Sequence, residues 1–169
     1  LKLLVKSGVP MVVFLNREIG CDLQNTVLVD TGLYEGSREC VKHLVKNGCR
    51  NIVYLDKTGK PCDRDIHLKG FLDQIKESGL VFEPEQKISG CKDVEELEER
   101  LQAILEKIPS VDAIVARYDD LAAVALSVAR KMGRNVPKDL AVAGFDNDFI
   151  SNYVSPALTT VEIQKEEVA

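Results

Sequence analysis

One segment, residues 111–147, restricts the possible folds more than any other part of the chain. Residues 112–116 form a short apolar run that contains two β-branched side chains, which is typical of a buried strand. Apolar residues then recur at helical spacing from Asp119, and Gly133 can end that helix. A second apolar run follows at 140–145. Two buried strands joined by a helix predict a parallel crossover unit.

Three polar side chains follow the two predicted strands directly. Tyr118 and Asp119 come after the first strand, and Asp146 comes after the second. In open α/β sheets, ligands gather at the carboxyl ends of the strands. We therefore expect these side chains on one rim, and we expect Asp119 to cap the helix that it begins.

The rest of the chain alternates between strand and helix patterns. The predicted strands are 9–15, 26–30, 52–55, 86–89 (a weak edge strand) and 159–163, and the predicted helices are 36–46, about 64–79 and 93–108. Within these helices, His43, Leu72 and Val94 are expected to face the core. The alternation predicts an α/β fold with a mostly parallel sheet flanked by helices.

Charge and cysteine content exclude several classes of function. The formal net charge of −5 argues against a nucleic-acid-binding surface within these 169 residues. No apolar run approaches the roughly 20 residues of a membrane span. Five cysteines at irregular spacing contain no C-x-x-C pair, which favours scattered reduced thiols and a cytoplasmic protein over a zinc site. The chain lacks an initiating Met, so we expect a processed or excised piece.

Motifs for catalysis are missing. The glycines of the segment DTGLYEGS fit neither common nucleotide-binding loop, and no G-x-S-x-G elbow is present. An enzyme of the phosphotransfer kind, using Asp56, Asp119 or Asp146 at strand ends, stays open as an alternative. We predict no enzyme activity and no cofactor.

Two segments near the end of the chain carry a family resemblance. VPKDLAVAGFDN, followed by PALTTV, resembles the signature of LacI/GalR-family bacterial transcription regulators. Further segments of the chain resemble the same family: GVP with Arg17, the GSR to HL segment at 36–44, and the pairs Gly70-Phe71 and Tyr118-Asp119.

The resemblance implies two α/β lobes similar to type I periplasmic binding proteins, behind a helix-turn-helix headpiece. Mapped by motif order, residues 1–29 are the end of the first lobe, 30–158 the second lobe, and 159–169 a return strand to the first lobe. A small effector, sugar-like or related, would bind between the lobes and change DNA affinity. The partners implied are that effector, a second copy of the chain, and DNA only through the headpiece that this sequence does not contain. A solute-binding protein for sugar uptake, with the same fold, is the alternative.

The ligand-binding residues implied by the resemblance are Asp146, Tyr118, His67, Arg64 and Arg17. Asp146 matches an aspartate that accepts hydrogen bonds from sugar hydroxyls or a base edge. Tyr118 stands where the family often has Asn and offers an aromatic face for stacking. His67 stands where the family usually has Arg, so a group that titrates near neutrality replaces a permanent cation. Arg64, one turn earlier, is expected to compensate.

Overall fold

The computed structural model describes residues 9–15, 25–57 and 65–163. Its strands are β1 Met11–Leu15, β2 Thr26–Asp30, β3 Ile52–Leu55, β4 Lys87–Ile88, β5 Ala113–Ala116, β6 Ala141–Phe145 and β7 Thr159–Val161. Its helices are α2 Leu33–Lys46, α3 Ile66–Glu77, α4 Val94–Lys107, α5 Asp119–Lys131 and α6 Ile150–Tyr153, with a 3₁₀ turn, η1, at Pro84–Gln86. The predicted α/β class is confirmed.

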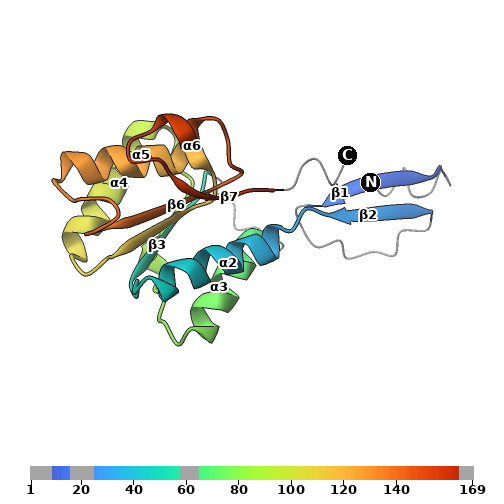
Figure 1. Cartoon of the computed structure of the whole chain (residues 1–169), viewed down its shortest axis with the longest axis horizontal. Coiled ribbons are helices and arrows are strands. Elements are labelled where there is room, and N and C mark those ends of the chain that lie inside the picture. Colours follow the sequence, from blue (N-terminus) through green and yellow to red (C-terminus); the bar gives the residue numbers. More distant parts are fainter. Residues whose placement is uncertain (1–8, 16–24, 58–64, 164–169) are drawn as a thin grey trace.

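The strands form two parallel sheets. β1 and β2 pair in register over all five residues, and Figure 1 shows this pair standing apart from the larger body. The second sheet has the order β4-β3-β5-β6-β7. The chain first moves outward from β3 to β4 and then returns to the other side of β3 to make β5. The loops after β3 and β5 therefore diverge, which opens a crevice at the carboxyl ends of these strands.

Helices cover both faces of the five-stranded sheet: α4 and α5 lie on one face and α2 and α3 on the other (Figure 1). The alternation of side chains along each strand produces these two layers. In β3, Val53 and Leu55 pack toward α4 and α5, whereas Ile52 and Tyr54 pack toward α2 and α3. Both faces are buried, so the strands read as continuous apolar runs.

A glycine sets the distance between α2 and α3. A Cβ atom at Gly70 would lie 2.4 Å from the carbonyl oxygen of Tyr34, so any larger residue would force the helices apart. The buried face of α3 is therefore the one that includes His67, Phe71 and Ile75. Leu72 lies about 100° around the helix from Phe71, and it is exposed.

Two other predictions of inward-facing residues are wrong. Val94 is the first residue of α4 and is exposed, because the helix meets the sheet only from Leu97 onward. His43 is also exposed, since α2 buries the neighbouring positions Val41 and Leu44.

The helix predicted at 36–46 begins earlier, at Leu33, after Gly32 in a left-handed conformation at φ 70°. Gly36 thus lies inside the helix, where a Cβ atom would be 2.9 Å from Phe145 Cζ. This close approach brings α2 against the carboxyl end of β6. None of the helices in the described ranges combines the length and hydrophobicity that a bilayer crossing requires.

Candidate functional site

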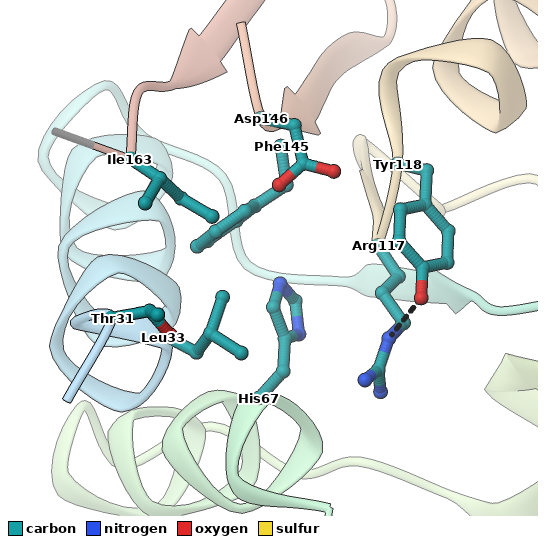
Figure 2. A pocket seen from close by; sticks show the side chains of 8 residues that line it. All are labelled: Thr31, Leu33, His67, Arg117, Tyr118, Phe145, Asp146 and Ile163. Atoms are coloured by element: carbon teal, nitrogen blue, oxygen red, sulfur yellow. Dashed lines mark hydrogen bonds between the residues drawn. The ribbon is translucent and has the colours of Figure 1, made fainter. Parts of the chain in front are cut away.

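A pocket of about 260 Å³ opens at the carboxyl ends of the central strands. Figure 2 shows its lining, which comes from the start of α2, from α3, from the ends of β5 and β6, and from the segment after β7: Thr31, Leu33, His67, Arg117, Tyr118, Phe145, Asp146 and Ile163. The pocket lies at the point where the strand order reverses. The structure thus brings Asp146, Tyr118 and His67 to one cavity from three separate elements.

Asp146 follows β6, and its backbone has a positive φ of 96°, which is rare for a residue with a side chain. Its amide donates to the carbonyl of Val161 at 2.8 Å, which ties the turn to the neighbouring strand. Such strained conformations cluster at functional sites. In Figure 2 the carboxyl group turns toward the pocket.

Tyr118 is the residue immediately before α5, and its ring stands at the pocket wall. The side chain of Arg117 donates to its hydroxyl oxygen at 3.2 Å. The Nζ atom of Lys57 lies 5.1 Å from the ring centroid, within reach of a cation–π contact. These contacts fix the orientation of the ring, as a stacking surface requires.

His67 lies in the first turn of α3 and is only 1% exposed. Its Nδ1 atom is 2.9 Å from the Tyr54 hydroxyl, and its ring packs edge-on against Phe145 at a centroid distance of 4.5 Å. Burial, together with the positive charge of Arg117, lowers the pKa of His67 to about 3. The expectation that His67 titrates near neutrality is therefore wrong, because a buried imidazole beside a guanidinium stays neutral.

Among the described residues that line the pocket, Arg117 carries the permanent positive charge, and it is not one of the predicted site residues. Its side chain is 13% exposed, forms an ion pair with Asp65 and lies 3.9 Å from the carboxylate of Asp56. Asp65 in turn caps α3, since its side chain accepts from the amides of His67 and Leu68. The feature of the sequence that could have identified Arg117 as a site residue is its position: it is the first residue after β5, beside Tyr118.

Arg64 and Arg17, the other two predicted ligand-binding residues, lie outside the described residues. The compensation expected from Arg64 therefore stays a prediction.

Asp119 has a structural role different from the expected helix cap. Tyr118, the residue before α5, makes no side-chain cap bond, and in the first turn it is Asp120 that accepts from an amide, that of Leu121 at 2.8 Å. Instead, the buried Asp119 carboxylate accepts from the amide of Asp148 at 2.7 Å and from the hydroxyl of Thr160 at 2.7 Å. A Cβ atom at Gly144 would lie 2.1 Å from Asp119 Oδ1, so this bonding requires glycine there. Asp119 thereby joins the segments after β5 and β6 to β7.

Comparison with known proteins gives consistent matches. Residues 41–169 match the family described as periplasmic binding protein-like domain. The chain is 30% identical over 155 residues to the ribose operon repressor of Halalkalibacterium halodurans, covering 92% of this chain and 45% of that protein. The chain thus spans about half the length of this relative.

Solved structures agree. A regulatory protein of the LacI family from Chloroflexus aggregans superposes with a TM-score of 0.85 at 26% identity, over 98% of this chain and 59% of that one. A LacI-family regulator from Arthrobacter sp. FB24, in complex with lactose, superposes with a TM-score of 0.75 at 26% identity, over 94% of this chain and 56% of that one. By fold, by motif and by these matches, the chain belongs to the periplasmic binding protein-like domain family, and it is similar to the corresponding part of LacI-family regulators.

Proposed function

We propose that the chain senses a small polar effector, a carbohydrate or a related molecule, in the pocket formed by Asp146, Tyr118, Arg117 and His67. The observation that carries the proposal is the convergence of these four side chains at the reversal point of the sheet. A pocket that combines an aromatic wall with a few oriented polar groups is the usual form of a small-molecule site.

The polar groups suit a ligand with several hydroxyl or carbonyl groups. Asp146 supplies an acceptor, and Arg117 and Tyr118 supply donors in a fixed arrangement. The Arthrobacter regulator in complex with lactose supports the choice of a carbohydrate. Arg64 and Arg17 stay candidates for further contacts.

Effector binding would be coupled to DNA binding through the arrangement of two lobes. We place the end of the first lobe at residues 1–29, the second lobe at 30–158 and the return at 159–169. Because β7 still pairs with β6, the returning chain leaves the second sheet after Val161. A ligand held between the lobes favours one angle between them, and so changes the DNA affinity of an N-terminal helix-turn-helix headpiece. The relatives named as repressors support this role over sugar uptake.

We further propose a homodimer. Phe149 and Tyr153 of the α6 region are 72% and 82% exposed, and their rings stack edge to face at 5.8 Å. Exposed aromatic pairs of this kind mark protein interfaces. Val12 and Val27 on the β1–β2 pair are also exposed and offer a second surface. The free thiols of Cys40, Cys49 and Cys91 support a cytoplasmic location.

Calorimetric titration of the purified chain with monosaccharides, disaccharides and purines tests the effector site. Asp146→Ala should weaken binding of any sugar that binds by about 1–3 kcal/mol, because a ligand hydroxyl loses its acceptor. Glu99→Ala, which removes an exposed carboxylate on α4, is the matched control and should leave affinity unchanged. Equal affinity in the wild type and Asp146→Ala would contradict the proposal.

Sedimentation at micromolar concentration tests the dimer. Phe149→Ser with Tyr153→Ser should shift the chain toward monomer, and Val12→Ser with Val27→Ser distinguishes the second surface. A wild-type chain that stays monomeric at high concentration would exclude both.

A further inference from the structure

Three consecutive backbone amides hold the turn that follows β6. The amide of Asp146 donates to a backbone carbonyl of β7 at 2.8 Å, and the amide of Asn147 donates to Thr160 Oγ1 at 3.3 Å. The amide of Asp148 donates to Asp119 Oδ2 at 2.7 Å. Each amide of the turn thus has its own acceptor, and the acceptors lie on two other segments, β7 and the start of α5.

Asp119 supports two of these three hydrogen bonds. It accepts from Asp148 directly, and its other oxygen, Oδ1, accepts from the hydroxyl of Thr160 at 2.7 Å. Because that hydroxyl directs its only proton at Asp119, its oxygen is oriented to accept from the amide of Asn147. Hydrogen bonds in such a chain polarise and strengthen one another. The carboxylate thus fixes the amides of both residues that follow Asp146.

The turn needs this support because its backbone conformation is unfavourable. Asp146 and Asn147 have φ angles of 96° and 46°, and residues with a Cβ atom rarely adopt a positive φ. Such conformations persist only where the surrounding contacts hold them. In this conformation the carboxyl group of Asp146 is turned toward the pocket (Figure 2). If the turn relaxed, that carboxyl group would leave its place in the pocket wall.

Asp119 itself lies outside the pocket. It is 1% exposed and is not among the described residues that line the pocket, and Thr160 is not among them either. The carboxylate fits between the three segments because Gly144 has no Cβ atom. Any effect of Asp119 or Thr160 on ligand binding must therefore be transmitted through the residues that they hold.

We propose that Asp119 is a positioning residue for the effector: its carboxylate, directly and through Thr160, holds the turn at 146–148 so that Asp146 faces the ligand. The inference rests on the proposed effector site, because it requires Asp146 to contact the ligand. Asp119 then contributes to affinity without touching the ligand. A residue that only stabilised the fold would change unfolding but not the affinity of the folded protein.

The support of the turn can be tested without a ligand, by amide hydrogen exchange followed by NMR. Thr160→Val has nearly the same shape but lacks the hydroxyl, so the Asn147 amide should exchange faster, whereas Thr160→Ser should keep the wild-type rate. Asp119→Ala should speed exchange at both Asn147 and Asp148, and Thr160→Val serves alone if Asp119→Ala does not fold. The amide of Leu101, inside α4, is the internal control. If the exchange rates of the turn do not change, Asp119 does not hold it and the inference is overturned.

Calorimetric titration with D-ribose and lactose tests the effect on binding. Thr160→Val should lower the affinity for a sugar that binds by about tenfold, and Thr160→Ser should restore it. Leu101→Ala, which removes a buried side chain far from the turn in sequence, should leave the affinity unchanged. In a chain that already carries Asp146→Ala, adding Thr160→Val should cause no further loss, because the side chain that the turn positions is gone.

The two proposals fail in different ways. If Asp146→Ala weakens sugar binding but Thr160→Val does not, the positioning role is wrong and the effector site stands. Equal losses from Thr160→Val with and without the Asp146 side chain would also overturn the positioning role. If neither sugar binds to the wild type, the proposed carbohydrate site is wrong, and the exchange rates alone uphold or overturn the support of the turn by Asp119.

Discussion

The two faces of the five-stranded sheet differ in whether their buried polar atoms have hydrogen-bond partners. On the face covered by α4 and α5, the buried Asp119 has both carboxylate oxygens hydrogen-bonded, and the buried hydroxyl of Ser151 donates to Asn147 Oδ1 at 3.1 Å. On the face covered by α2 and α3, the structure buries Ser37, His67 and Gln74, each with an unpartnered polar atom in the described part of the chain.

This difference separates stability from binding. The α4–α5 face gains free energy from apolar burial and complete hydrogen bonding. The α2–α3 face contributes His67 to the pocket, and Gly36 and Gly70 let its helices approach closely enough to build the pocket wall. If this division is right, substitutions on the first face change unfolding most, and those on the second face change ligand binding or pH response.

The largest expected effect lies on the α4–α5 face. Leu101 is fully buried there, so Leu101→Ala should lower the free energy of unfolding by about 2–5 kcal/mol through lost burial and a cavity. Urea denaturation measures this. Val94→Ala, on the same helix but exposed, should change it by about 0.5 kcal/mol or less. If Leu101→Ala and Val94→Ala lowered the free energy of unfolding equally, burial on this face would not explain its contribution to stability.

Asp119→Asn tests complete hydrogen bonding on the same face. An amide offers only one acceptor atom, so if it accepts from the Asp148 amide, its nitrogen can only donate to Thr160 Oγ1, and the hydroxyl proton of Thr160 loses its present acceptor. We expect a loss of about 1–3 kcal/mol in thermal or urea unfolding. Asp120→Asn is the neighbouring control. Its carboxylate is half-exposed in an ion pair with Lys57, and we expect about 1 kcal/mol or less.

The α2–α3 face should make stability depend on pH through His67. Its pKa is about 3 in the folded chain, against an ordinary value of 6.5, so below pH 6.5 the unfolded chain takes up a proton that the folded chain does not. Stability should therefore fall as pH falls from 6.5 toward 3, by about 1 kcal/mol between pH 7 and 5.5. His67→Gln should remove this part of the slope, and His43→Gln should not. If His67→Gln leaves the pH dependence of the free energy of unfolding unchanged, a group other than His67 causes that dependence.

The smallest expected effect is at Ser37. Its hydroxyl is buried without a partner among the described residues, so Ser37→Ala removes an unpaired polar group at nearly constant shape. The free energy of unfolding should stay equal or rise by up to about 1 kcal/mol. Differential scanning calorimetry measures the change. A clear loss of stability would show that the two faces are more alike than their hydrogen bonds indicate.

The sequence by itself determined the layout of the fold. β2 and β3 lie at the predicted residues, and β5, α5 and β6 follow the predicted order within a residue or two, because apolar periodicity reports directly which side chains are buried. The resemblance carried by GFDN and LTTV also indicated the family. The positions of Tyr118 and Asp146 followed from the rule that parallel strands end on the same side.

Only the tertiary structure decided the chemistry of the pocket. The neutrality of His67 depends on burial under Phe145 and on the charge of Arg117, 50 residues along the chain. The Asp119 carboxylate accepts hydrogen bonds from Asp148 and Thr160 and does not cap its own helix. This position is possible because Gly144 has no Cβ atom, which would otherwise clash with Asp119 Oδ1. Protonation and hydrogen bonding depend on groups that are distant in sequence and meet only when the layers pack, so the pattern of residues could locate the site but not its charge.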